Sequence, residues 1–228
     1  GNDFLPHLLN LSIDRDHVDK MLDIYYEILL EEGSTLLNVR DNCVNLSFLR
    51  NYLEALAREE DHELEVKISS YYSRRFYNRG KTEFEQQISL HENWPLTIRN
   101  RNRDPIRLDK PGWKPRYYSN KFNVFYGDTE EVDNICSAYY KTIMWVYQYY
   151  FKTHCPSWEW AYPYLDPPAI SDLVKYFKYD MNSIEYAPTS PVNPLEQLLI
   201  VLPPSSRGLL PDSYARLMIE PTSPLAEY

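Results

Sequence analysis

Several features that define common protein classes are scarce in this chain of 228 residues. Its three cysteines, Cys43, Cys136 and Cys155, show neither a Cys-x-x-Cys pair nor a Cys/His ligand spacing, which argues against a disulfide framework and a structural zinc site. Its six glycines form no phosphate-binding loop, and no Gly-x-Ser-x-Gly elbow is present. No apolar run approaches the length of a membrane span. The sequence therefore gives no support to nucleotide hydrolysis, a serine hydrolase or a membrane partner.

Starting signals are also missing, because the chain begins Gly1-Asn2-Asp3 without a Met, a basic segment or a cleavage site. We expect the natural start to lie upstream. The cysteine pattern fits a reducing compartment, so we expect an intracellular protein. The pattern does not separate the cytoplasm from the nucleus, and both stay open, with the cytoplasm favoured. His154 next to Cys155 suggests a thiolate nucleophile, but no orienting Asn or Asp pattern accompanies the pair, and a structural cysteine is favoured.

Aromatic residues are abundant, at 15% of the chain, and 21 of them are tyrosines. Large rings must therefore fill much of the interior, and their hydroxyl groups need hydrogen-bond partners. The length allows one large core or two small ones, and we expect a single domain over residues 1–228.

Helical periodicity dominates the sequence. Apolar residues recur at helical spacing from Asp14 to Glu32, and Gly33 follows at the position of a C-cap. A second, long helix is predicted from Asn45 through the acidic stretch 59–61 towards residue 77. A helix that begins at Asp128 becomes so apolar towards Phe151 that it must be buried. Shorter helices are predicted at 170–178, 195–202 and 212–218, the second of them with Asn193 as its cap, Pro194 at its first position and Glu196 two residues on.

The segments between these helices are rich in proline and arginine. Residues 78–123 lose the helical period and contain several Pro and Gly residues, which predicts an extended loop or insertion. Within this segment Trp113 stands among cationic and aromatic residues, so it either stacks on a ligand or docks the loop, and docking is favoured. The predicted fold is mainly α, an irregular multi-helix domain with long Pro- and Arg-rich loops.

Charge is unevenly distributed. The net charge is −9, yet the segment from Lys67 to Lys121 contains thirteen Lys or Arg against five Asp or Glu, a local charge of +8. Such a field suits a polyanion such as RNA, because each neutralised phosphate releases counterions. A solvated basic loop is an equally good explanation at this stage.

Two motifs near opposite ends of the chain carry a family resemblance. The sequences Gly1-Asn2-Asp3-Phe4-Leu5-Pro6-His7-Leu8 and Cys155-Pro156-Ser157-Trp158-Glu159-Trp160 resemble segments of the 5′-to-3′ exoribonucleases of the Xrn1 and Rat1/Xrn2 family. Further segments resemble the same family in the same order, namely 33–60, Gly112–Tyr118, the helix before Lys152 and 194–203. The resemblance identifies the chain as the helical second half of such a catalytic region.

The resemblance implies a role for three residues. Asp3 would be one ligand of a carboxylate cluster that holds Mg²⁺ or Mn²⁺, although composition alone favours a cap or turn residue. Trp158 or Trp160 would stack on a base of threaded RNA, and packing of both rings under the Pro-rich loop is the alternative. The other metal ligands and the pocket for a 5′-monophosphate would belong to an upstream nuclease half of the same polypeptide. We therefore expect the parent to degrade 5′-monophosphorylated single-stranded RNA processively, and this piece alone to be inactive.

Other interpretations stay open. The chain departs from the family at Leu9, where a proline is usual, and at 161–168, which reads Ala-Tyr-Pro-Tyr-Leu-Asp-Pro-Pro in place of Tyr-Tyr-Pro-Tyr-His-Tyr-Ala-Pro. It is therefore a divergent member of the family it resembles. A non-catalytic RNA- or protein-binding scaffold with the same helical fold is the main alternative. A flap-type endonuclease shares the metal chemistry but does not predict the Pro-Ser-Trp-x-Trp segment.

Overall fold

The computed structural model describes residues 15–73, 80–92, 104–152 and 155–225. These residues are mainly helical, which confirms the predicted fold class, and they include one short two-stranded sheet. The chain divides into two compact units, residues 1–155 with 161–185, and residues 156–160 with 186–228. The single domain predicted for residues 1–228 stays a prediction. Among the described helices, none combines the length and the apolar character needed to cross a bilayer.

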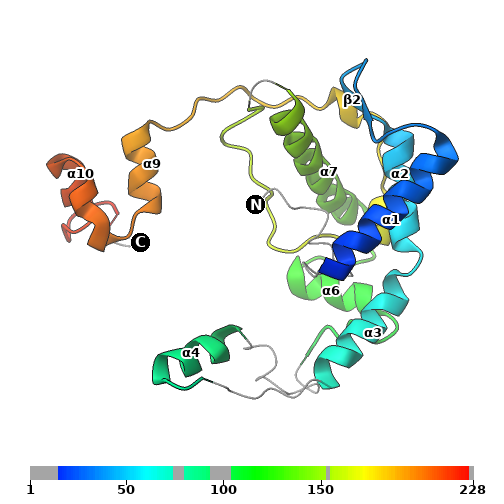
Figure 1. The fold of residues 1–228 in the computed structure, drawn as a ribbon, viewed down its shortest axis with the longest axis horizontal. Helices are drawn as coiled ribbons and strands as arrows, with labels where there is room; N and C mark the ends of the chain where they lie inside the picture. Colours follow the sequence, from blue (N-terminus) through cyan, green and yellow to red (C-terminus); the bar gives the residue numbers. More distant parts are fainter. Residues whose placement is uncertain (1–14, 74–79, 93–103, 153–154, 226–228) are drawn as a thin grey trace. The chain divides into compact units, whose positions relative to one another are not determined.

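The first unit begins with helix α1, Arg15–Glu32, which packs against α2 (Figure 1). Gly33 ends α1 with a positive φ of 64°, and its N–H donates to the carbonyl oxygen of Leu29 at 3.0 Å. The Tyr52 hydroxyl of α2 donates to the Met21 carbonyl of α1 at 3.1 Å. The amphipathic helix and its glycine cap are confirmed.

The predicted second helix is two helices. Strands β1, Leu37–Asn38, and β2, Cys43–Val44, pair antiparallel before α2, Leu46–Ala57, begins with the Asn45 side chain accepting from the Phe48 N–H at 3.2 Å. A turn at residues 58–59 then separates α2 from α3, Glu60–Ser73. The prediction of one long helix is wrong at this point, because the chain turns so that Glu60 becomes the buried first residue of α3.

Two helices lie in the described parts of the segment 78–123, for which the sequence predicts an extended loop or insertion. They are α4, Glu83–Glu92, and α6, Trp113–Lys121, so the prediction is wrong for these stretches. Helix α6 is short and polar in sequence and is stabilised by tertiary packing, because Trp113, Tyr117 and Tyr118 are buried. The Arg116 side chain donates to four carbonyl oxygens of the preceding loop, at 2.6–3.1 Å.

Helix α7, Thr129–Phe151, is the longest of the described part of the chain and is buried along most of its length. Asp128 caps it by accepting from the Glu131 N–H at 3.2 Å. Burial extends through Met144 and Gln148, whereas the last three residues, 149–151, are exposed. The predicted buried helix is therefore confirmed except for its final turn.

Tyrosines fill the core of the first unit, as their abundance predicts. The hydroxyl of Tyr117 donates to the Pro167 carbonyl at 2.8 Å, and that of Tyr140 donates to the Leu173 carbonyl at 2.6 Å. These bonds reach into and just before helix α8, Ile170–Lys175, which packs against α2 and α7 and is followed by the 3-10 turn η3, Met181–Ser183. Burial raises the pKa of both tyrosines, so they act as neutral donors.

The second unit contains α9, Pro194–Val201, the 3-10 helix η4, Pro204–Leu209, and α10, Asp212–Leu217. Asn193 and Glu196 form a reciprocal capping box at the start of α9, with Pro194 in the first turn. No residue of these three helices is buried. The predicted helices and the Asn193 cap are confirmed, and this unit has little core of its own.

Candidate functional site

The three residues predicted to act on RNA have different outcomes. Asp3 lies outside the described residues, so its role stays a prediction. Trp158 and Trp160 both lie in the second unit, in a segment without regular secondary structure. The two tryptophans differ in exposure and in the residues that they contact.

Trp158 combines an exposed ring with a fixed backbone. Its side chain is 57% exposed, and its backbone N–H donates to the Thr189 hydroxyl oxygen at 2.7 Å. The same Thr189 oxygen lies 3.3 Å from the hydroxyl oxygen of buried Ser157, which accepts from the Glu159 N–H, also at 3.3 Å. The segment is thus tied to residue 189 at Ser157 and at the Trp158 backbone while the Trp158 ring stays accessible, which is what a stacking platform requires.

Trp160 is in a different environment, because it is half-buried and its ring lies edge-on to that of Tyr186, with centroids 6.2 Å apart and planes at 67°. Burial raises the pKa of Tyr186. An edge-to-face pair of this kind is a packing contact. Of the two candidates, Trp158 is the better presented for a ligand and Trp160 packs within its unit.

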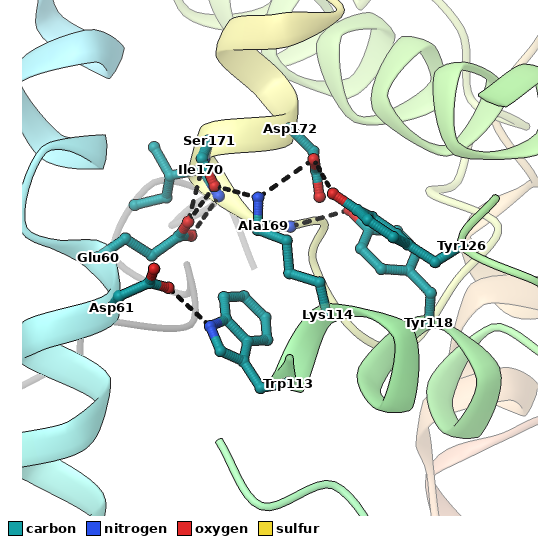
Figure 2. Close-up of polar contacts among 10 residues, drawn as sticks. All are labelled: Glu60, Asp61, Trp113, Lys114, Tyr118, Tyr126, Ala169, Ile170, Ser171 and Asp172. Carbon is teal, nitrogen blue, oxygen red and sulfur yellow. Dashed lines mark hydrogen bonds and ion pairs between the residues drawn. The ribbon is translucent and has the colours of Figure 1, made fainter. Parts of the chain in front are cut away.

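A second constellation of functional-looking groups lies in the first unit, where α3, α6 and α8 meet (Figure 2). Glu60, only 2% exposed, accepts from the Ile170 N–H at 2.6 Å, from the Ser171 N–H at 3.3 Å and from the Ser171 hydroxyl. It therefore caps the start of α8 from another helix. Burial raises the pKa of the Glu60 carboxyl, although the Ser171 hydrogen bond and the Lys114 charge oppose this.

Lys114 connects Ser171, the partner of Glu60, to a second buried carboxylate, that of Asp172. Its ammonium group donates to the Ser171 hydroxyl at 2.5 Å and to Asp172 Oδ1 at 3.2 Å, and Asp172 Oδ1 also accepts from the Tyr126 hydroxyl at 2.8 Å (Figure 2). The chain Tyr126–Asp172–Lys114–Ser171–Glu60 is a continuous polar network in the interior of the unit. Lys114 pairs with Asp172, and the Ser171 hydroxyl connects Lys114 to Glu60, so these contacts form a structural network that joins three helices.

Trp113 docks its loop, as the sequence analysis favours. The ring is 4% exposed and its Nε1–H donates to Asp61 Oδ1 at 2.7 Å (Figure 2). Residues around it line a pocket of about 480 Å³ that contains groups of both charges, including Asp61, Glu65, Lys110 and Lys114. This mixture gives the pocket no preference for a polyanion.

The basic segment is largely used for internal contacts where the structure describes it. Arg116 binds four carbonyl oxygens, Lys114 pairs with Asp172, and Lys121 lies 3.2 Å from Asp166 Oδ1. These cations stabilise the fold and leave less positive charge for RNA than the local charge of the sequence suggests. The arginines at 74, 75, 79, 99, 101 and 103 lie outside the described residues.

The segment 161–168, which departs from the pattern of the family it resembles, keeps two tyrosines of that pattern. Tyr162 and Tyr164 are retained and pack on the core, with ring centroids 5.4 Å from Tyr139 and 5.3 Å from Phe122 respectively. The altered positions, 161, 165, 166 and 167, are exposed or half-buried. The rings of Tyr162 and Tyr164 therefore contribute to the packing of the first unit.

Two of the cysteines differ in their surroundings. Cys136 is buried, and burial raises the pKa of its thiol, as suits a structural cysteine. Cys155 is half-buried, and His154 lies outside the described residues, so the geometry of that pair stays untested. Within the described ranges, no three His, Cys, Asp or Glu side chains come together in a group that could hold a metal ion.

The sequence analysis did not predict the buried network around Glu60, because it treated 59–61 only as an acidic stretch of a long helix. A signal was available: Leu49, Leu53, Leu56, Glu60 and Leu64 are all buried and follow one another at intervals of three or four residues. Glu60 thus occupies a core position of the helical period. A charged residue in that register indicates a buried partner.

The comparisons with known proteins match this chain to a helical domain, in agreement with its mainly helical structure. The sequence pattern of the family described as Xrn1 helical domain matches residues 1–94 and 55–228. A 5′-3′ exoribonuclease 2 homolog of Drosophila melanogaster is 28% identical over the whole chain, which spans 29% of that relative, and human 5′-3′ exoribonuclease 1 is 29% identical over the whole chain, which spans 15% of it. The 5′-3′ exoribonuclease 2 homolog of Caenorhabditis elegans is 41% identical over 55% of the chain, or 12% of its own length.

These matches define the class of protein as a helical region found within much larger 5′-3′ exoribonucleases. The chain belongs to the Xrn1 helical domain family. It spans less than a third of the length of the relatives compared here.

Proposed function

We propose that this chain is the helical part of a processive, metal-dependent 5′-to-3′ exoribonuclease that degrades 5′-monophosphorylated single-stranded RNA. Its contribution would be one carboxylate, Asp3, and one stacking platform, Trp158. The parent protein would act inside the cell, in the cytoplasm rather than the nucleus. Membership of the Xrn1 helical domain family supports the enzyme class. The observation that carries the role of this region is the exposed Trp158 ring on a backbone held by Thr189.

Stacking suits an enzyme that advances along RNA of any sequence. Every base has an aromatic face, so a tryptophan binds each nucleotide in turn without reading its edge, at about 1–3 kcal/mol per base. Trp158 is the better candidate because Trp160 already packs against Tyr186. In this proposal Trp158 holds a base in line with the reacting phosphate, and the neighbouring backbone keeps the ring in place.

The proposed role of Asp3 is to supply an oxygen ligand for Mg²⁺ or Mn²⁺ together with carboxylates from an upstream nuclease half. Such hard cations prefer carboxylate oxygens, and one carboxylate cannot hold a metal pair. When bound, the metal would activate the attacking water and stabilise the leaving oxygen of the phosphodiester. Asp3 would fix the position of that charge relative to the RNA path.

The test uses the full-length protein that contains this chain, with RNA carrying a 5′-monophosphate and a 3′ fluorescent label. The proposal expects mononucleotides released from the 5′ end only when Mg²⁺ or Mn²⁺ is added, and little degradation of the same RNA with a 5′-hydroxyl. Asp3→Asn is expected to abolish release without changing the melting temperature. Degradation from the 3′ end, or full activity of Asp3→Asn, contradicts the proposal, and an inactive full-length protein that still binds RNA favours the scaffold alternative.

A further inference from the structure

We propose that Thr189 is a positioning residue, which holds Trp158 in the orientation that stacks on RNA. This inference rests on the proposed stacking role of Trp158. Thr189 is about thirty residues further along the chain than Trp158, yet its hydroxyl oxygen is the acceptor for the Trp158 N–H at 2.7 Å, the shortest of the three bonds that organise this segment. No motif of the sequence points to it.

The contacts of Thr189 fix two successive residues. Its hydroxyl oxygen receives the Trp158 N–H and lies 3.3 Å from the Ser157 hydroxyl oxygen, and Ser157 in turn accepts from the Glu159 N–H. Ser157 is buried, so this side of the segment is anchored in the unit. The backbone of this segment is thereby held at Ser157 and at the Trp158 N–H, while the Trp158 ring is exposed.

The chain on both sides of Thr189 is stiff. Pro188 precedes it and Pro191 follows two residues later. Proline fixes its own φ angle and restricts the residue before it, here Ala187 and Ser190, to extended conformations. The hydroxyl group of Thr189 is therefore presented by a segment with few alternative conformations, so that binding RNA costs little ordering of this part of the protein.

Thr189 can support RNA binding in two ways. If Thr189 acts through Trp158, its hydroxyl matters only while the indole ring is present. If Thr189 merely stabilises the unit, its removal weakens RNA binding by the same factor with or without the ring. A double-mutant cycle distinguishes these cases.

The experiment measures the affinity of the full-length protein for 5′-monophosphorylated RNA that carries 2-aminopurine at one of its first nucleotides. Stacking on an indole quenches this probe. Thr189→Val removes the hydroxyl and keeps the β-branched shape, Thr189→Ser keeps the hydroxyl, and Thr222→Val makes the same exchange at an exposed position of the same unit. All variants are compared with Trp158→Ala and with the Thr189→Val/Trp158→Ala double variant.

We expect Thr189→Val to weaken RNA binding about two- to tenfold and to reduce the quenching at one nucleotide position, because a hydrogen bond of ordinary net strength is lost. Thr189→Ser and Thr222→Val should bind like the wild type. In the Trp158→Ala background, Thr189→Val should cause no further loss.

Three results would overturn the inference. If Thr189→Val binds RNA with wild-type affinity while Trp158→Ala binds more weakly, Trp158 is the stacking residue and Thr189 does not position it. An equal loss in both backgrounds makes Thr189 a structural residue only. Wild-type affinity and quenching of Trp158→Ala removes the stacking role itself, and the positioning role with it. If Thr189→Val folds poorly, the fluorescence quenching of the Thr189→Ser variant is compared with that of Trp158→Ala. Loss of quenching in Thr189→Ser, which keeps the hydroxyl, would show that the hydroxyl does not hold the ring.

Discussion

Replacing Glu60 by alanine should destabilise the first unit strongly. Three donors lose their acceptor, namely the Ile170 N–H, the Ser171 N–H and the Ser171 hydroxyl, and the start of α8 is buried, so water cannot replace the carboxylate without rearrangement. Each unsatisfied buried donor costs about 1–3 kcal/mol. Removing a buried carboxylate offsets part of this, because its desolvation is relieved. We expect a net loss of about 2–5 kcal/mol, a large part of the stability of a typical domain.

The assay is urea unfolding of the 228-residue chain followed by far-ultraviolet circular dichroism. Glu60→Gln keeps one carbonyl acceptor and should lose about 1–2 kcal/mol. Glu59→Ala is the matched control, since this adjacent carboxylate is exposed and pairs with Lys20 at 3.0 Å. If Glu60→Ala is no less stable than Glu59→Ala, the carboxylate is not the cap of α8 and the account of the network is refuted.

Three further predictions concern the same unit and the isolated chain. Because burial raises the folded-state pKa of Glu60 above its ordinary value of 4.5, the stability due to its protonated form is complete below that pH and is lost as pH rises through the folded pKa. The stability difference between wild type and Glu60→Gln should therefore narrow as pH rises above 4.5, and a difference that widens contradicts this assignment. Trp113→Phe, which removes the donor to Asp61, should destabilise the chain by about 1–2 kcal/mol and leave the RNA affinity of the full-length protein unchanged; reduced affinity at unchanged stability would restore the stacking interpretation of Trp113. The purified 228-residue chain should not hydrolyse RNA with Mg²⁺, and divalent-dependent degradation by it would disprove the expectation of missing ligands.

Local signals in the sequence were sufficient for most helices. The Gly33 cap, the Asp128 cap and the Asn193–Glu196 box each satisfy backbone groups within a few residues, and these helix ends lie where the signals predict. The apolar period of α7 likewise predicted its burial. In each of these cases the stabilising interaction is encoded within one stretch of chain.

The failures occur where the partner is distant in sequence. Helix α6 is polar and short, and its stability comes from buried rings and from Arg116 contacts that no local pattern reveals. The break before Glu60 depends on a helix that begins 110 residues later. The same limit applies to Trp158 and Trp160. Their sequence motif predicts an aromatic pair, and the two roles are separated only by the exposure of the Trp158 ring and by contacts with Thr189 and Tyr186, which lie about thirty residues later.

The most direct test of this account is the RNA affinity and run length of the full-length protein with Trp158→Ala. Loss of one stacked base should weaken binding about 5- to 150-fold and release partly degraded RNA, while the melting temperature stays close to that of the wild type. Phe125→Ala, which removes another exposed ring, should change neither quantity. Unchanged affinity and run length for Trp158→Ala, together with reduced stability, would show that the ring packs within the protein and has no part in holding RNA.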